Sequence, residues 1–159
     1  MAASIITNVD IYQQIAEEAF ESMEEAFKAI RRRRPDGGGW IFALDPTNRS
    51  FKFALVYIAF SGMWLEAKLH LTISERFGKR VAKDIDRKDY EAKLELLGFL
   101  DADLRANLEY FRGLRREIMH EKAFLDSGKI RYAQDEAHKV KSLMKELMRR
   151  FEATEERSK

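Results

Sequence analysis

Hydrophobic positions recur every three or four residues along most of the chain, which is the period of a helix face. In the first such stretch we expect Asp10 to begin a helix, with Gln13 as its capping-box partner, and Arg31–Arg34 to end it. The segment Pro35-Asp36-Gly37-Gly38-Gly39 then breaks the helix, so residues 31–50 are expected to form a loop. The apolar face of this helix comprises Ile11, Ile15, Ala19, Met23, Ala26, Phe27 and Ile30.

A second long helix is expected from about Arg49 to Phe77, where Gly78 supplies the C-terminal stop. Between Phe53 and Leu65 its residues are apolar nearly all round instead of along one stripe. A helix of that kind is buried over most of its circumference, so we expect it to be the most buried helix of the fold.

Three further helices are expected in the second half of the chain. Asp86 or Asp89 caps a short helix that runs through Leu97, and Gly98 interrupts it. Asp101 begins a longer helix, which the segment Asp126-Ser127-Gly128 closes. The apolar positions are Leu104, Leu108, Phe111, Ile118 and Met119 in that helix, and Ile130, Ala133, Ala137, Val140, Leu143, Leu147 and Phe151 in the last one.

The pattern as a whole predicts an all-α fold. No segment shows convincing strand alternation, and the chain has two prolines in 159 residues. We expect an up-and-down bundle of four main helices with an extra short helix. The length favours a single helical domain over residues 1–159, with frayed ends at 1–9 and 152–159.

The composition narrows the possible chemistry. The chain has no cysteine, which excludes disulfides, zinc–thiolate sites and cysteine nucleophiles. The N-terminal residues lack the basic and apolar regions of a secretory signal, and no apolar run is long enough to span a bilayer, so we expect a cytoplasmic protein. A net charge of +2 does not indicate nucleic-acid binding unless the charges cluster locally.

One charged residue falls on an apolar helix face. Within the sequence LRREIMHE (114–121), Arg115 lies near the middle of the apolar arc of its helix. A guanidinium keeps its charge, so it needs an acidic partner, a polar groove or a partner chain. Arg115 is therefore either structural, paired with a carboxylate on the neighbouring helix such as Glu66, or functional.

A second feature of this helix is a polar stripe. Arg112, Arg116 and His120 follow one another at four-residue spacing and share a face, which suits either phosphate binding or simple solvation. His120 points about 140° away from Arg115 on an ideal helix. The two can converge if the helix ends or distorts there, or if a second copy of the helix faces it.

These residues resemble a known family. An arginine, four intervening residues and a histidine near the end of the third main helix are similar to the R-x4–6-H motif of HEPN domains. The segment Trp64-Leu65-Glu66-Ala67 resembles the first core helix of that family, and Lys129-Ile130-Arg131-Tyr132 resembles the approach to its final helix. The resemblance covers roughly Phe51 to Phe151.

The resemblance implies metal-independent RNA cleavage by a homodimer, with the two motifs meeting at the interface and no cofactor. His120 would act as the base on the RNA 2′-OH, and Arg115 would stabilise the charge that develops on the phosphate. Arg112 and Arg116 would hold flanking phosphates. A toxin or defence role, with an antitoxin or regulatory protein as partner, would fit this activity.

Two alternatives remain open. The chain could be a catalytically silent interaction module of the same fold, with Arg115 structural and His120 on the surface. A carboxylate–histidine metal site is the other, because Glu117 and His120 have i, i+3 spacing and Glu66 and His70 have i, i+4 spacing.

The cluster Arg31–Arg34 also has two interpretations. Four cations at a helix C-terminus interact favourably with the helix dipole. They could also clamp RNA, and Trp40 and Phe42 beyond the glycines could either stack on bases or pack against the protein.

Overall fold

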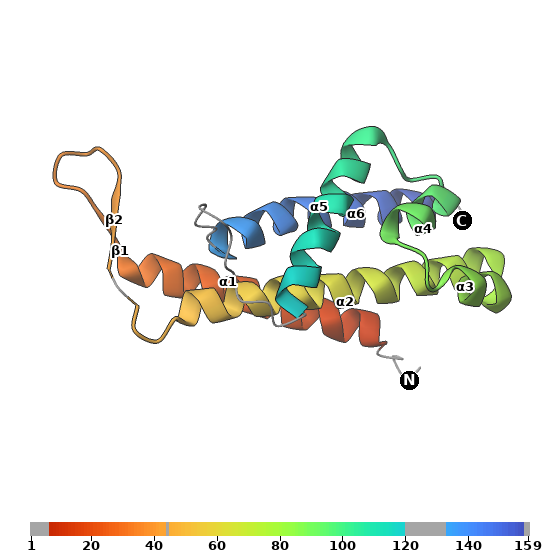
Figure 1. The fold of residues 1–159 in the computed structure, drawn as a ribbon, viewed down its shortest axis with the longest axis horizontal. Coiled ribbons are helices and arrows are strands. Elements are labelled where there is room, and N and C mark those ends of the chain that lie inside the picture. Colours follow the sequence, from red (N-terminus) through yellow and green to blue (C-terminus); the bar gives the residue numbers. More distant parts are fainter. Residues whose placement is uncertain (1–6, 44, 120–132, 158–159) are drawn as a thin grey trace.

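The computed structural model describes residues 7–43, 45–119 and 133–157, which form six helices and one two-stranded antiparallel sheet. The chain is therefore predominantly α-helical, as predicted, with a small sheet in addition (Figure 1). The strands form a hairpin between the first two helices. The elements are α1 (Asn8–Ile30), β1 (Arg31–Arg33), β2 (Trp40–Phe42), α2 (Arg49–Phe77), α3 (Lys79–Ile85), α4 (Tyr90–Leu97), α5 (Ala102–Met119) and α6 (Ala133–Arg157).

Helix α2 is the centre of the fold. It begins and ends at the predicted residues, and Gly78 ends it with a positive φ of 87° that favours glycine. It packs against every other helix of the described chain. Ala54, Ile58, Leu65 and Leu69 are fully buried along it, which is why its sequence is apolar nearly all round.

The helices do not all run up and down. α1 and α2 lie side by side and antiparallel, and α6 also packs on α2, but α5 crosses these helices obliquely (Figure 1). The short helices α3 and α4 turn the chain at the end of α2 and set the direction in which α5 enters. The regular four-helix arrangement that the sequence suggested is therefore correct for the α1–α2 pair and not for α5.

Capping side chains fix where the helices begin. Asp89 accepts a hydrogen bond from the Ala92 amide at 3.0 Å, and Asp101 accepts one from the Leu104 amide at 2.8 Å, so two predicted starts are confirmed. The start of α1 differs from the prediction. Thr7 is the N-cap and Asp10 is its capping-box partner, so the helix begins two residues earlier.

Three other predictions are corrected by the structure. Residues 79–85 form α3, which the sequence pattern did not indicate. α6 continues to Arg157 instead of fraying after Phe151. The expected loop contains the β1–β2 hairpin, closed by a hydrogen bond from the Arg34 amide to the Gly39 carbonyl at 3.0 Å.

The core contains most of the predicted apolar positions. Leu104, Leu108 and Phe111 of α5 are buried, and Leu114 rather than Ile118 continues this face most deeply. The buried apolar side chains of α6 are Ala133, Ala137, Val140, Leu143, Met144, Leu147 and Phe151, and those of α1 are Val9, Ala16, Ala19, Met23 and Ala26. Within the described ranges, no helix combines the length and apolar character needed to cross a membrane.

Candidate functional site

Arg115 reaches from α5 toward both α2 and α4. Its Nη1 donates a hydrogen bond to the hydroxyl of Tyr90 on α4 and lies 3.9 Å from Oε1 of Glu66 on α2. The ion pair with Glu66 that the helix pattern suggested is thus present, and Tyr90 is an additional partner. The Arg115 side chain as a whole is 23% exposed.

The backbone of α2 approaches Arg115 closely at Gly62. A Cβ at this position would lie 2.2 Å from Nε and 2.3 Å from Cδ of Arg115, far inside van der Waals contact. Glycine is therefore what allows the arginine to lie against α2. Glu66 follows Gly62 by one helical turn, so the same face of α2 accommodates the stem of Arg115 and pairs with its head.

Glu66 is shared between two cations. Its Oε2 lies 2.7 Å from Nζ of Lys93 on α4, a side chain that is 4% exposed. Coulombic attraction falls with distance, so the closer Lys93 takes the larger part of the Glu66 charge. Arg115 is consequently held in place by Glu66 but only partly neutralised by it.

Tyr90 is a buried member of this group. Its ring stacks on Phe111, with centroids 6.1 Å apart and an interplanar angle of 21°. Burial raises the pKa of the Tyr90 phenol to about 12, although the neighbouring Arg115 lowers it. The hydroxyl therefore remains protonated across the physiological range and accepts the arginine hydrogen bond as a neutral group.

Arg112 is tied to α4 by two carboxylates. Its Nη1 lies 3.0 Å from Oδ2 of Asp89 and its Nη2 lies 3.3 Å from Oε1 of Glu91, whose side chain is 5% exposed. The pKa of Asp89 is lowered, first by the Ala92 amide and then by Arg112. Arg112 is thus paired within the fold, while 37% of its side chain remains exposed.

The group as a whole is balanced in charge. It joins three cations from α4 and α5 with three carboxylates from α2 and α4. We call it the α4–α5 network, and its members are Glu66, Asp89, Glu91, Lys93, Arg112 and Arg115. Tyr90 adds its hydroxyl.

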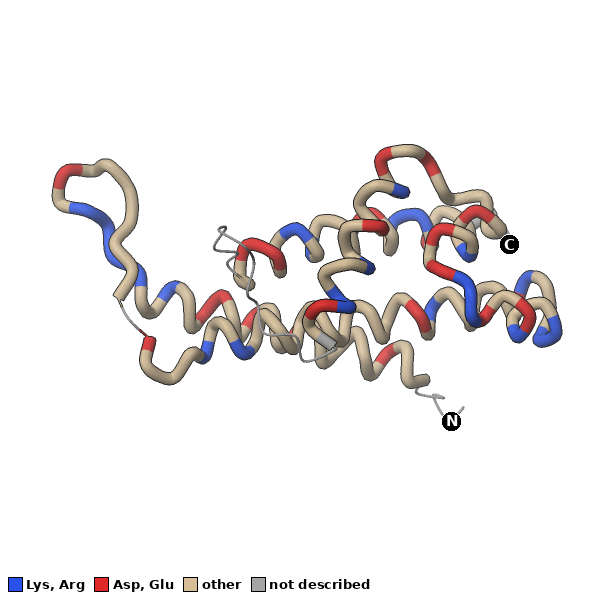
Figure 2. Tube along the Cα trace, in the orientation of Figure 1, with Lys and Arg blue, Asp and Glu red and all other residues tan. Residues whose placement is uncertain are grey.

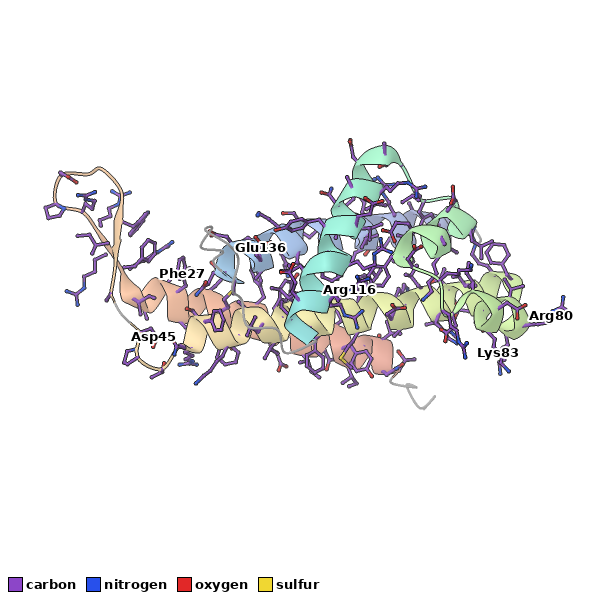
Figure 3. All side chains as sticks on the ribbon, in the orientation of Figure 1. Phe27, Asp45, Arg80, Lys83, Arg116 and Glu136 are labelled. Atoms are coloured by element: carbon purple, nitrogen blue, oxygen red, sulfur yellow. The ribbon has the colours of Figure 1, made fainter. Side chains whose placement is uncertain are left out.

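Of the other two predicted site residues, only Arg116 is among the described residues. Arg116 is exposed on α5 (Figure 3). His120 lies outside the described residues, so its distance from Arg115 is not given by the structure. Two residues of the predicted stripe of Arg112, Arg116 and His120 are therefore described: Arg112 pairs with carboxylates, and Arg116 is exposed.

A groove gives access to the exposed side of Arg115. It has a volume of about 580 Å³ and lies between the start of α1, the second half of α2 and Arg115, with Glu66 and His70 on its wall. A second hollow of about 640 Å³ lies between α5 and α6, but it contains none of the predicted site residues. The first groove is thus the place where a ligand could reach the motif arginine.

The proposed metal-binding arrangement finds no support in the described part of the chain, where no group of three or more metal-ligating side chains occurs. His70 lies 3.6 Å from Asp86, whereas Glu66 turns to Lys93 and Arg115. The pair Glu117–His120 extends beyond the described residues. His138, on α6, is half exposed, and its Nε2 lies 2.9 Å from Oε1 of Glu24 on α1.

Comparison with known proteins identified no related protein. A scan against protein-family models, a search of curated proteins and a search of solved structures each found no match.

Proposed function

We propose that this chain is a HEPN-like RNA-binding protein that cleaves RNA without a metal ion, as a homodimer with Arg115 and His120 of both copies at the interface. The observation that carries this proposal is the state of Arg115. Its guanidinium is oriented by Tyr90 and Glu66, packed on Gly62, and still partly exposed to a groove. A cation fixed before the substrate arrives can stabilise developing charge without reorganising.

The reaction that fits these residues is an internal transfer within RNA. His120 accepts the proton of a 2′-OH as its oxygen attacks the adjacent phosphorus. The bond to the 5′ oxygen breaks, and His120 of the second copy supplies the proton to that leaving oxygen. The products are a 2′,3′-cyclic phosphate and a 5′-OH, and Arg115 stabilises the charge on the non-bridging phosphate oxygens.

A second copy would bring the two side chains of the motif together. Arg115 and His120 diverge by about 140° on an ideal continuous helix, and His120 follows the last described residue of α5. A two-fold interface brings the arginine of one copy toward the histidine of the other. Such a dimer could be silenced by an antitoxin or regulatory protein that covers the same surface.

The competing function is a catalytically silent interaction module. It is favoured by the engagement of Arg112 and Arg115 in a charge-balanced network, since both arginines then have a structural explanation. The two functions differ in what removal of each residue does. A structural Arg115 supports folding alone, whereas a catalytic Arg115 also sets the rate of cleavage.

The test is cleavage of a labelled structured RNA in the presence of EDTA. We expect wild type to cut, His120→Ala to lose at least about 100-fold in rate, and Arg115→Lys to lose a comparable factor because a lysine lacks the planar fork. His138→Ala is the matched control, since this histidine lies on α6 and pairs with Glu24.

The readouts separate the two functions. Circular dichroism and light scattering report whether each variant keeps its helices and its dimer. Cleavage by wild type, lost in folded dimeric His120→Ala and kept in His138→Ala, supports the nuclease. Absence of cleavage by wild type, together with unfolding of Arg115→Ala, supports the silent module.

A further inference from the structure

The β1–β2 hairpin projects beyond the adjoining ends of α1 and α2 (Figure 1). Its form follows from the sequence at its tip. Pro35 and Asp36 occupy a turn closed by a hydrogen bond from the Gly37 amide to the Arg34 carbonyl at 3.1 Å. Gly37 and Gly39 have φ angles of +72° and +129°, which non-glycine residues rarely adopt.

The hairpin places arginine and aromatic side chains on one face. Arg31 pairs with Phe42 and Arg33 pairs with Trp40, and these positions point to the same side because side chains alternate along a strand. The guanidinium carbons of Arg31 and Arg33 lie 4.5 and 5.8 Å from the centroid of the Trp40 ring. Arginine stacked in this way keeps its N–H edges available for phosphate.

The same side chains are exposed. Trp40, Ile41 and Phe42 are 46%, 51% and 52% exposed. The base of the hairpin is nevertheless fixed, because Phe42 stacks on Phe27 of α1 with centroids 5.0 Å apart. The hairpin is therefore anchored to α1 while its apolar rings remain accessible. Exposed rings do not stabilise the fold of the single chain, and such surfaces are typical of binding sites.

The positive charge of the hairpin is largely uncompensated. Four arginines and one aspartate give residues 31–42 a net charge of +3, while the whole chain has +2. Arg34 lies 3.8 Å from Asp36, whereas Arg31, Arg32 and Arg33 form no ion pair with another described residue. Figure 2 shows this basic run at one end of the molecule, away from the α4–α5 network.

We propose that the β1–β2 hairpin binds single-stranded nucleic acid, with Arg31–Arg34 on the phosphates and Trp40 stacking on a base. The combination of a basic strand with accessible rings is what a sequence-tolerant single-strand site requires. Duplex bases are already stacked and offer their faces poorly, so the single strand is the preferred form. This site does not depend on the Arg115–His120 motif and could bind without cleavage.

Two other occupants fit the hairpin less well. A membrane-inserting hairpin carries its apolar side chains at the tip, but here the tip is Asp36-Gly37-Gly38-Gly39 and the rings lie along the stem. A second copy pairing edge to edge would bring two arginine clusters together, and like charges on an edge strand oppose such pairing.

The experiment measures fluorescence anisotropy of a labelled 2′-O-methyl oligouridine of about 20 nucleotides, a length that spans several nucleotide positions. This probe has no free 2′-OH, so binding is measured separately from cleavage. We expect Trp40→Ala to weaken binding about 5- to 100-fold and Trp40→Phe to stay near wild type, because phenylalanine keeps a stacking face. Binding should quench the intrinsic fluorescence of Trp40. Trp64, the second tryptophan, is buried, so its fluorescence should not change.

The charge contribution is tested by salt dependence. Arg32→Ser combined with Arg33→Ser should reduce the slope of log affinity against log salt by about 1.4, or about 0.7 per lost phosphate contact. The matched control is Arg80→Ser combined with Lys83→Ser, two exposed cations of α3 at the opposite end of the molecule (Figure 3). This control should leave both affinity and slope unchanged.

Three outcomes would overturn the proposal. The first is oligouridine affinity that is equal in wild type, Trp40→Ala and the Arg32/Arg33 variant. The second is preferential binding to phosphatidylserine vesicles, lost in Trp40→Ala, which would assign the arm to a membrane. The third is an affinity for polyglutamate equal to that for oligouridine, which would show that the hairpin binds any polyanion.

Discussion

The contact between Gly62 and Arg115 makes a strong prediction about the substitution Gly62→Ala. Alanine normally stabilises a helix interior relative to glycine by about 0.5–1 kcal/mol. At this position, however, the new Cβ would lie 2.2 Å from Nε of Arg115. The arginine must move, since the helix backbone around residue 62 is buried in the centre of the fold.

The cost of that movement can be worked from the contacts that Arg115 makes. The hydrogen bond from its charged Nη1 to the Tyr90 hydroxyl is worth about 1.5–3 kcal/mol. The partly exposed ion pair with Glu66 at 3.9 Å adds at most about 1 kcal/mol. After the helix gain is subtracted, Gly62→Ala should lower the free energy of unfolding by about 1–3 kcal/mol.

In a protein that also carries Arg115→Ala, the effect of Gly62→Ala on the free energy of unfolding should change sign. No guanidinium then lies over residue 62, so Gly62→Ala should raise the free energy of unfolding by about 0.5–1 kcal/mol. The two substitutions are therefore coupled by about 1.5–4 kcal/mol, as expected for residues in direct contact. A double-mutant cycle measures this coupling. Its four proteins are wild type, Gly62→Ala, Arg115→Ala and the double variant, each unfolded in urea and followed by far-UV circular dichroism.

A coupling energy near zero would refute the reasoning. If Gly62→Ala stabilised both backgrounds equally, Arg115 would not lie against α2, and the arrangement of the α4–α5 network would be wrong. The cycle also bears on function, because a displaced Arg115 should slow RNA cleavage while leaving His120 unchanged.

Two pH-dependent predictions follow from the shifted pKa values. The unfolded chain loses a tyrosine proton near pH 10, whereas burial holds the folded Tyr90 pKa at about 12, so its contribution is complete below pH 10 and is lost as pH rises from 10 toward 12. Wild type should therefore lose about 1 kcal/mol more stability than Tyr90→Phe by about pH 11 in urea titrations, and parallel curves would contradict this. Hydrogen bonds from Arg149 and Arg150 lower the Glu146 pKa from 4.5 to about 2, so its contribution is present above pH 4.5 and is lost as pH falls toward 2. Glu146→Gln should slightly reduce the loss of stability between pH 4.5 and 2; the effect is small because the carboxylate is 34% exposed and screened by solvent. A wild-type urea midpoint that does not change between pH 4.5 and 2 would argue against the pairing.

Elements with strong local signals could be predicted from the sequence. The bounds of α2 agree with the predicted ones, because its sequence is apolar nearly all round from Phe53 to Leu65 and Gly78 can adopt the positive φ that ends it. Asp89 and Asp101 were recognisable because an N-cap carboxylate satisfies amides three residues later. Thr7 was missed because Asp10 is also a common cap, and the sequence does not distinguish the cap from its capping-box partner.

The hairpin could not be predicted because its strands are too short for alternation to be visible. Three arginines resemble a solvated helix end, and the pairing with Trp40–Phe42 depends on contacts across the glycine turn. A usable signal was nevertheless present. Pro-Asp-Gly between a basic and an aromatic triplet is a turn signature that favours a hairpin over an irregular loop.

The candidate site was predicted in part. Helical periodicity predicts Arg115 as a charge on an apolar face, because this argument concerns one helix at a time. It offers Glu66 as a candidate partner on the neighbouring helix, and the structure places the two 3.9 Å apart. Tyr90, Lys93 and Gly62 were not found, since their contacts depend on how α4 turns against α2 and α5. The glycine in the apolar run of α2 was the available signal, because an interior glycine often marks close packing.

The distribution of charge separates the two proposed activities. The α4–α5 network balances its cations with carboxylates, so it exerts little attraction beyond contact distance, while residues 31–42 carry +3 with few partners. Long-range capture of a polyanion follows uncompensated charge, so the hairpin should govern RNA affinity and its salt dependence. The arginine of the network should govern the rate of cleavage once RNA is bound. Substitutions in the hairpin are therefore expected to raise KM with kcat unchanged, and Arg115→Lys to lower kcat with little change in the salt slope. The reverse pattern would require the two sites to exchange roles.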